Sequence, residues 1–270
     1  MKYILMTGLA FATLATFAAQ AQDTSSGAQT PSGEWTGSGE VGFASTTGNS
    51  RSQNINAKLT LNQETDQWKN NFFLDALRNK GQVTVTEPNG TSAKQFDTTA
   101  DRYDVGASAG YKLDPRSYIV TAFRYDHDDF AANRWQGTVS VGYGYLALKT
   151  DRTQLSVEIG PGYTEYQPAT GTQTVNGETL PLVEPQQSEA VARGLVNYKY
   201  RLTDNTAFDD TFLTEAGTKN TYLQNDAGLA VSMTKKLSIK VGFQVRHNSE
   251  VLPGIRRTDT LTTTNLVYNL

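Results

Sequence analysis

The chain has 270 residues, 24 of them basic and 27 acidic, and it contains no cysteine. The absence of cysteine excludes a disulfide framework, thiolate metal sites and a cysteine nucleophile. The near balance of charge gives no indication of nucleic-acid binding, and we expect neither a cofactor nor a bound metal.

The first 21 residues have the features of a cleaved secretory signal. Lys2 supplies the positive start, residues 3–17 are mostly apolar, and Ala19-Gln20-Ala21 forms a small-x-small cleavage site. Removal of this segment takes away one of the 24 basic residues, so 23 basic and 27 acidic residues remain and the net charge becomes -4. We therefore expect a protein that is exported to the periplasm and beyond.

The segment 22–33 is small and polar, and we predict a disordered periplasmic lead-in. No later stretch approaches the roughly 18 uncharged apolar residues that a spanning helix needs. The mean hydropathy of -0.48 also argues against a helical membrane protein. It does not argue against a β-barrel, in which only every second residue contacts lipid.

From residue 34 to residue 270, polar and apolar residues alternate with a period of two. In the segment 52–62, one face carries amides, hydroxyls and a lysine, which suits a water-filled lumen better than a soluble core. The alternation predicts an all-β fold, a transmembrane antiparallel meander β-barrel of about twelve strands. We place the strands at 34–46, 51–63, 67–79, 101–113, 117–126, 135–148, 153–166, 189–202, 206–217, 222–233, 237–247 and 258–270.

The connections between these strands give a second, independent indication of a barrel. Connections after even-numbered strands are tight, as at 64–66, 114–116 and 203–205. Connections after odd-numbered strands are often longer, as at 80–100, 127–134, 167–188 and 248–257. Outer-membrane barrels have short periplasmic turns and long outer loops, so both ends of the barrel domain should lie on the periplasmic side.

The apolar residues of the alternation should face lipid, and many tyrosines lie near predicted strand ends, where aromatic girdles form. Two strands fit less well. Arg124 and Asp210 fall on the predicted outward side, which indicates either a bulge or an error in the assigned register.

The inward face carries charges of both signs together with many glycines. We predict that Glu40, Lys58, Asp75, Glu158 and Arg193 lie near mid-depth and line any pore. Two accounts remain open. The charges could pair across a narrow lumen, with the glycines making room for long side chains, or the glycines could widen a wet channel of mixed charge.

The outer ends of the strands carry the residues that could support chemistry. Asp126, His127 and Asp128 form one group, and His247 stands beside Ser249 and Glu250. A Ser-His-acid set at the rim would indicate a hydrolase, but triads are rarely built from sequence neighbours. The acidic run lacks the spacing of a calcium loop. We therefore predict rim residues without a catalytic role.

Several passages together are similar to domain-of-unknown-function family 481, which comprises salt-induced outer-membrane proteins. These passages are Gly37–Asn49 (GSGEVGFASTTGN), Glu158–Tyr163 (EIGPGY), Ala192-Arg193-Gly194, Val245–Asp259 (VRHNSEVLPGIRRTD) and the closing 266–270 (LVYNL). The resemblance implies an exported outer-membrane barrel and a link to osmotic or salt conditions. It implies no catalytic residues.

The leading hypothesis is a non-enzymatic outer-membrane β-barrel of a Gram-negative bacterium with a structural or small-solute pore role. Its expected partners are outer-membrane lipid, lipopolysaccharide and the outer-membrane assembly machinery. One alternative is an outer-membrane hydrolase that acts on lipid or lipopolysaccharide at the barrel rim. Another is a soluble periplasmic β-barrel that binds a ligand.

Overall fold

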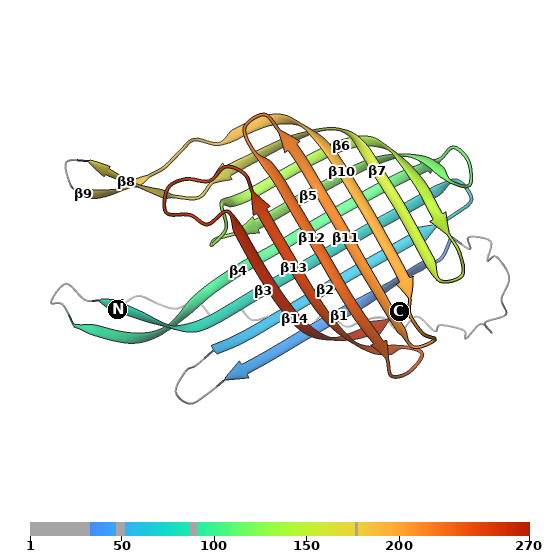
Figure 1. Cartoon of the computed structure of the whole chain (residues 1–270), viewed down its shortest axis with the longest axis horizontal. Coiled ribbons are helices and arrows are strands. Elements are labelled where there is room, and N and C mark those ends of the chain that lie inside the picture. The colour runs from blue at the N-terminus through green and yellow to red at the C-terminus, as the bar shows by residue number, and fades with distance from the viewer. Residues whose placement is uncertain (1–32, 47–51, 87–90, 176–177) are drawn as a thin grey trace, which may run out of the picture. The chain divides into compact units, whose positions relative to one another are not determined.

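The computed structural model describes residues 33–46, 52–86, 91–175 and 178–270. Within these residues, twelve strands close into one antiparallel barrel, and strands that follow each other around the ring are paired (Figure 1). The ring closes where β1 pairs with β14. A separate two-stranded sheet, β8 with β9, lies in the connection between β7 and β10. No helix in the described part is long and apolar enough to cross a membrane.

The bounds of the strands follow the sequence closely. The first half of the barrel consists of β1 (Trp35–Thr46), β2 (Ser52–Glu64), β3 (Trp68–Thr86), β4 (Ser92–Lys112), β5 (Ser117–Asp128) and β6 (Asn133–Lys149). The second half consists of β7 (Thr153–Pro168), β10 (Gln187–Arg201), β11 (Thr206–Gly217), β12 (Thr221–Ser232), β13 (Leu237–Asn248) and β14 (Thr258–Asn269). The outer hairpin is formed by β8 (Gly171–Val175) and β9 (Glu178–Leu182).

The two faces of each strand differ in the way the alternation predicts. In β7, Ser156 and Glu158 point inward and are only 2% and 7% exposed, whereas Ile159 points outward and is 66% exposed. Successive side chains of a strand point to opposite faces, so the apolar residues form an exposed outer surface and the polar residues line the lumen. This inverted arrangement is that of a transmembrane β-barrel, and the predicted fold class is confirmed.

The barrel has one end with short turns and one with longer connections. The short turns span 65–67, 113–116, 150–152, 202–205 and 233–236, and both ends of the barrel domain lie at this short-turn end. There, the amide of Leu270 donates to the carbonyl oxygen of Gly37 (2.9 Å). The short turns after even-numbered strands are as predicted, and the connections 169–186 and 249–257 at the other end are long. The predicted long connection 127–134 is wrong, because only residues 129–132 lie between β5 and β6.

The connections at the opposite, long-loop end contain more strand than predicted. The expected loop 80–100 is largely an extension of β3 and β4, which continue past a register shift between Asn79 and Lys80. The expected loop 167–188 contains the hairpin β8–β9, which is tied to the 249–257 connection where the Thr172 amide donates to the Pro253 carbonyl (3.0 Å). Strand pairing satisfies backbone groups that an irregular loop would leave to water.

Aromatic side chains gather at both ends of the outer surface. At the short-turn end, Trp68 and Tyr111 meet edge to face, with ring centroids 5.3 Å apart. At the long-loop end, Tyr103 stacks on His127 at 5.0 Å, and Tyr125 stacks on Trp135 at 6.3 Å. This arrangement agrees with the predicted girdles, in which aromatic rings lie where lipid meets water.

The two misfit charges have different explanations. Arg124 points into the lumen, and β5 pairs with both neighbours without a register shift. The outward position was therefore wrong, and of the two explanations the register error, not the bulge, is confirmed there. Asp210 does lie on the outward face of β11, also in regular pairing. It accepts a hydrogen bond from Asn225 Nδ2 (2.8 Å), which partly compensates a charge on that face.

The short turns are fastened by side chains that bond to the turn backbone. Asp114 Oδ1 accepts hydrogen bonds from the amides of Arg116 (2.7 Å) and Ser117 (2.9 Å). These bonds, the one from the Arg116 amide above all, lower the pKa of Asp114 from its ordinary value. Thr65, in another of these turns, accepts from the Trp68 amide (2.8 Å). The predicted signal peptide 1–21 and the lead-in 22–33 lie outside the described residues, apart from Gly33.

Candidate functional site

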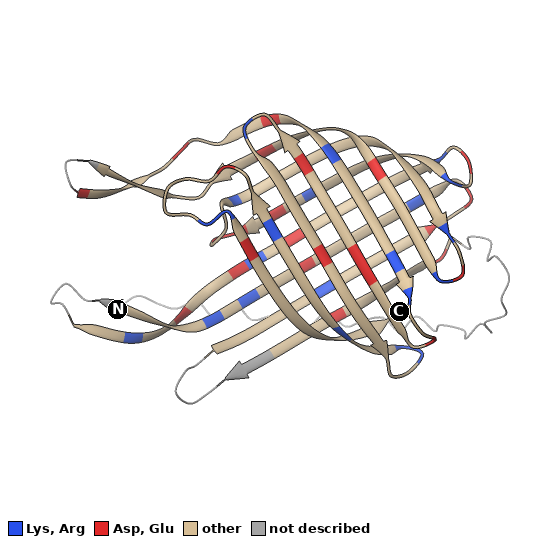
Figure 2. Ribbon diagram, in the orientation of Figure 1, with Lys and Arg blue, Asp and Glu red and all other residues tan. Residues whose placement is uncertain are grey.

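A cavity of about 1110 Å³ occupies the lumen and reaches the turns at 150–153 and 203–206 of the short-turn end. Its wall is made by the inward faces of strands from all around the ring, and charged residues recur along those strands (Figure 2). Hydroxyl and amide side chains fill much of the remaining wall. They include Ser38, Thr60, Asn62, Asn71, Ser108, Ser140, Asn197 and Thr211. Such a wall binds water and small polar solutes rather than apolar ones.

All five residues predicted to line a pore, Glu40, Lys58, Asp75, Glu158 and Arg193, border this cavity. Glu40, Lys58 and Asp75 face one another in register across β1, β2 and β3. Glu158 and Arg193 lie on the neighbouring strands β7 and β10 and form an ion pair of 3.2 Å. The structure therefore places these side chains in the lumen, and a conducting path along them remains a prediction.

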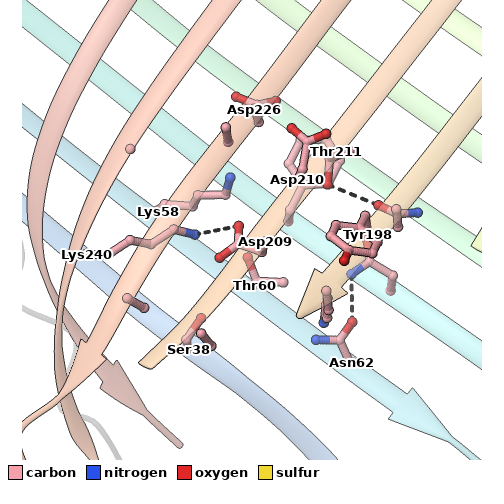
Figure 3. Close-up of a pocket in the computed structure, with 18 of the residues that line it drawn as sticks. Ser38, Lys58, Thr60, Asn62, Tyr198, Asp209, Asp210, Thr211, Asp226 and Lys240 are labelled. Atoms are coloured by element: carbon pink, nitrogen blue, oxygen red, sulfur yellow. Dashed lines mark hydrogen bonds and ion pairs between the residues drawn. The ribbon is translucent and has the colours of Figure 1, made fainter. Parts of the chain in front are cut away.

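The mid-depth charges are paired by a lysine that the prediction did not include. Lys240 Nζ lies 3.1 Å from Asp209 Oδ2 and 3.5 Å from Glu40 Oε1, so it links β13 to β11 and to β1. Figure 3 shows Lys240 reaching toward Asp209, with the dashed line marking this pair, and Lys58 lying beside them. These pairs join next-nearest strands along the wall and leave the cavity open beside them.

A second group of charges crosses the lumen nearer the long-loop end. Arg124 of β5 donates from Nη2 to Glu215 Oε2 of β11 (2.6 Å), and it also pairs with Asp126. Its guanidinium lies over the ring of Tyr222, 4.7 Å from the centroid. Three strands separate β5 from β11 by the shorter way around the ring, so this contact spans the lumen.

A second cross-lumen pair lies beside the first. Arg246 of β13 donates from Nη1 to Asp104 Oδ1 of β4 (3.3 Å), with a further contact from Nη2, and Arg102 approaches the same carboxylate at 3.9 Å. Both arginines and Asp104 are at most 7% exposed. We call the six charged residues of these two contacts the plug. They are Arg102, Asp104, Arg124, Asp126, Glu215 and Arg246.

The environment of the plug satisfies its buried polar atoms. The side chain of Glu215 is 1% exposed and accepts hydrogen bonds from Gln136 Nε2 (3.0 Å) and Thr138 Oγ1 (3.1 Å) in addition to Arg124. Thr138 shares a further hydrogen bond with Thr164 (3.0 Å). A buried ion pair is tolerated when neighbouring groups complete its hydrogen bonding, and the plug meets that condition.

The inward glycines make room for large side chains. A β-carbon on Gly106 would lie 2.2 Å from the ring of Phe73, and one on Gly144 would lie 2.2 Å from the ring of Tyr118. One on Gly228 would lie 2.3 Å from Lys240 Cε. Of the two accounts left open by the sequence, these positions support the first, in which glycines admit long side chains into the lumen.

The four rim candidates are not brought together. Asp126 is 7% exposed and belongs to the plug. His127 points outward and lies 3.3 Å from Asp129, whereas Asp128 accepts from the Phe130 amide (2.9 Å). His247, on β13, contacts Thr258 Oγ1 through Nδ1 (2.8 Å).

The imagined Ser-His-acid set is not formed either. Ser249 Oγ accepts from the Thr221 amide (2.8 Å) and donates to Asn220 Oδ1 (3.3 Å), and it does not contact His247. Among the described residues, no group of three or more His, Asp or Glu side chains is arranged to hold a metal ion. The described rim thus carries structural hydrogen bonds.

The plug is not recognisable as a unit from the sequence. Arg124 was placed on the wrong face, although its spacing of two from Asp126 puts both on the same face of β5. That spacing was the available signal. The pairing of Arg124 with Glu215 joins residues 91 positions apart, and periodicity alone carries no information about which residues meet across a lumen.

The fold and the lumen together define a transmembrane β-barrel with a polar, charged interior. Within that class, a sequence model described as "Protein of unknown function, DUF481" matches residues 39–270. The chain belongs to this family.

One curated relative and two solved structures illustrate what the chain is similar to. The "Uncharacterized protein YdiY" of Escherichia coli (strain K12) is 24% identical over 230 residues, which cover 85% of this chain and 81% of the relative. The solved structure titled "NanC porin structure in rhombohedral crystal form" is 12% identical, with a TM-score of 0.44, and 87% of this chain and 98% of that chain are covered. The COG4313 outer membrane channel from Pseudomonas putida F1 is 10% identical, with a TM-score of 0.46 and coverages of 90% and 97%.

Proposed function

We propose that this protein is a non-enzymatic outer-membrane channel for small polar solutes, in which the plug closes the half of the lumen nearer the long-loop end. The cavity then faces the periplasm as a water-filled vestibule. The observation that carries the proposal is the pair of cross-lumen contacts, Arg124 with Glu215 and Arg246 with Asp104, above a cavity of about 1110 Å³.

The plug lies at one end of the lumen, which supports its role as a gate; side chains that filled the barrel would instead be spread along its whole length. Asp126, Glu215 and Arg246 each lie two residues from the long-loop end of their strands, β5, β11 and β13. The hydroxyl- and amide-rich wall lies on the other side of them. Passage through the lumen therefore requires the plug to separate, whereas the vestibule is open without any rearrangement.

The family resemblance implies a link to salt, and we include that link in the proposal. Exposed charges are screened strongly by salt, whereas buried pairs are screened much less. Because the plug is buried, we expect salt to change the amount of this protein in the envelope rather than the opening of its lumen. The conductance of the protein, corrected for that of the solution, should then not rise with salt concentration.

The decisive experiment is single-channel recording of the refolded protein in a planar bilayer. The wild type should be silent or open briefly, and the double variant R124Q/E215Q should give steady openings because it removes both charges of a cross-lumen pair. Asp126 loses its arginine partner in this variant, so its folding needs a separate check. The matched control is R193Q/E158Q, which neutralises a pair between neighbouring strands and should behave as the wild type.

Folding of each variant is checked by heat-dependent gel mobility, so that silence is recorded only from closed barrels. If folded R124Q/E215Q stays silent, a second variant, R246Q/D104N in the same background, removes the other crossing pair. Silence from this fourfold variant would refute the channel proposal and leave a structural role in the envelope.

A further inference from the structure

The junction that closes the ring is far less paired than the others. β1 and β14 are paired over four residues, from Ser38 with Asn269 to Val41 with Leu266. Each other junction of the barrel has at least 11 residue pairs among the described residues. Toward the long-loop end, β1 and β2 diverge from β13 and β14 (Figure 1).

The divergence leaves two strand edges without partners in the ring. Among the residues that the structure describes, the segment 258–265 of β14 pairs only with β13, and the segment 42–46 of β1 pairs only with β2. In the hydrocarbon region, backbone groups without hydrogen bonds are strongly unfavourable, and open sheet edges do not occur there facing lipid alone. The side opening between these edges therefore needs an occupant that brings hydrogen-bonding groups.

A chain of polar contacts marks the point where the two strands part. Asn56 Nδ2 donates to Asn265 Oδ1 (2.9 Å), and Asn265 Nδ2 donates to Glu40 Oε2 (3.1 Å), which is also the partner of Lys240. The two amides cross over Gly42, where a β-carbon would lie 2.3 Å from Asn56 Oδ1 and 2.4 Å from Asn265 Oδ1. The opening thus begins at an ordered contact that joins β2, β14, β1 and β13.

The two sides of the opening differ in polarity. On the β1 side, the outward Val41 and Phe43 are 58% and 70% exposed. On the β14 side, the outward residues are threonines at 260, 262 and 264. Behind the opening, Leu261 and Thr263 point inward and border the lumen cavity.

We propose that this side opening binds a lipid-like amphiphile. Its acyl chain lies outside against Phe43 and Val41, and its hydrogen-bonding head group passes between β1 and β14 toward Thr263. The polar cavity accommodates the head group, and the exposed Val41 and Phe43 contact the acyl chain. The head group also supplies hydrogen bonds to the unpaired edges of β1 and β14. A second protein strand fits less well, because the diverging edges allow one straight strand to pair with only one of them. The proposal does not depend on whether the lumen conducts.

The test uses single cysteines, which are unique because the chain has none of its own. Bimane is attached to T263C, T264C or T211C, and each protein is refolded in phosphatidylcholine vesicles. The vesicles contain a phosphatidylcholine quencher that carries its nitroxide either on the head group or, as a doxyl group, on the acyl chain. Thr264 points to lipid, Thr211 is a lumen threonine on β11 that is remote from the junction, and Thr263 lies behind the opening.

The proposal predicts strong quenching at position 263 by the head-group nitroxide, strong quenching at position 264 by the acyl-chain doxyl group, and none at 211 by either. If position 263 behaves as 211 does, no acyl chain or head group reaches the opening and the proposal is wrong. If 263 and 264 are both protected and the protein migrates as a dimer in non-denaturing gels, a second copy covers the opening, which also overturns the proposal.

A pair of double-cysteine variants tests the opening itself. V41C/L266C places two cysteines opposite each other in the paired part of the junction, where a disulfide can form. F43C/T264C occupies the next positions of the same register, beyond the contact at Gly42. We expect the first variant to oxidise in the membrane and the second to keep free thiols, counted by mass after alkylation. Equal oxidation of the two would show a closed junction and refute the proposal.

Discussion

The two halves of the lumen use similar residues in different ways. Near the short-turn end, Lys240 and Arg193 pair with acids on neighbouring or next-nearest strands, so the charges lie along the wall and the cavity remains. Near the long-loop end, Arg124 and Arg246 reach acids on distant strands, and the lumen is crossed. The difference teaches that side-chain partners, more than strand number or glycine content, decide whether a barrel of this width is open.

The largest contrast between the halves should appear when one acid is removed from each. In E215A, the buried Arg124 loses one of its two carboxylate partners, and we expect the free energy of unfolding to fall by about 3–5 kcal/mol. In the control D209A, the lost partner was 38% exposed, and we expect a loss of about 1 kcal/mol or less. Urea unfolding in vesicles, followed by gel mobility, measures both. Equal losses would contradict the distinction between the halves.

A glycine substitution tests whether the inward glycines are there to admit large side chains. In G106A, the added methyl group would collide with the ring of Phe73, and we expect the free energy of unfolding to fall by about 1–3 kcal/mol. Gly39 is the control, because nothing lies within 4 Å of its β-carbon position. G39A should leave stability unchanged or raise it slightly. The same unfolding assay applies, and a neutral G106A would show that the ring moves freely.

The charged residues of the vestibule should determine ion selectivity when the lumen conducts. The triple variant E40Q/D75N/E158Q removes three acids from the cavity wall and leaves Lys58, Lys240 and Arg193 in place. We therefore expect selectivity to shift toward anions, measured as the reversal potential in a salt gradient, in the R124Q/E215Q background if the wild type is silent. The variant D97N/E165Q/E178Q, which neutralises acids outside the cavity lining, is the control. Unchanged selectivity in the first variant would exclude these acids from the path.

The smallest effect is expected at a turn far from both halves of the lumen. The pKa of Asp114 is lowered in the folded protein, so its carboxylate stabilises the fold above its ordinary pKa, and this contribution is lost as the pH falls through the folded-state pKa. D114A should therefore melt at a slightly lower temperature near neutral pH and at the wild-type temperature in strong acid. A difference that persists in acid would show that the effect does not come from the carboxylate.

Much of the barrel could be predicted from residue order because lipid and water impose a period of two. The predicted strand 206–217 matches β11, and the predicted 153–166 differs from β7 by two residues at one end. The prediction failed where strands leave the membrane, as in the outer parts of β3 and β4 and in the hairpin β8–β9. There, water contacts both faces, and the alternation of polar and apolar residues no longer marks a strand.

The candidate site was predictable in part for the same reason. Successive side chains of a strand point alternately to lumen and lipid. Glu40, Lys58 and Glu158 could therefore be assigned to the lumen from the polarity of their neighbours alone. Partner choice was not predictable, because the contact between Asp104 and Arg246 depends on the closure and stagger of the whole ring. The side opening at β1 and β14 was equally hidden, since both strands have the alternation of a fully paired strand.

The short junction between β1 and β14 also bears on how the folded ring comes apart. Local unfolding starts where the fewest interactions must be broken, and four residue pairs with the Leu270–Gly37 hydrogen bond hold this junction. Thermal unfolding should thus begin when β1 and β14 separate along their whole junction, while the other junctions remain paired. The barrel then opens reversibly into a twelve-stranded sheet at the β1–β14 junction. Substitutions at this junction change the free energy of opening without changing the pairing of the other strands.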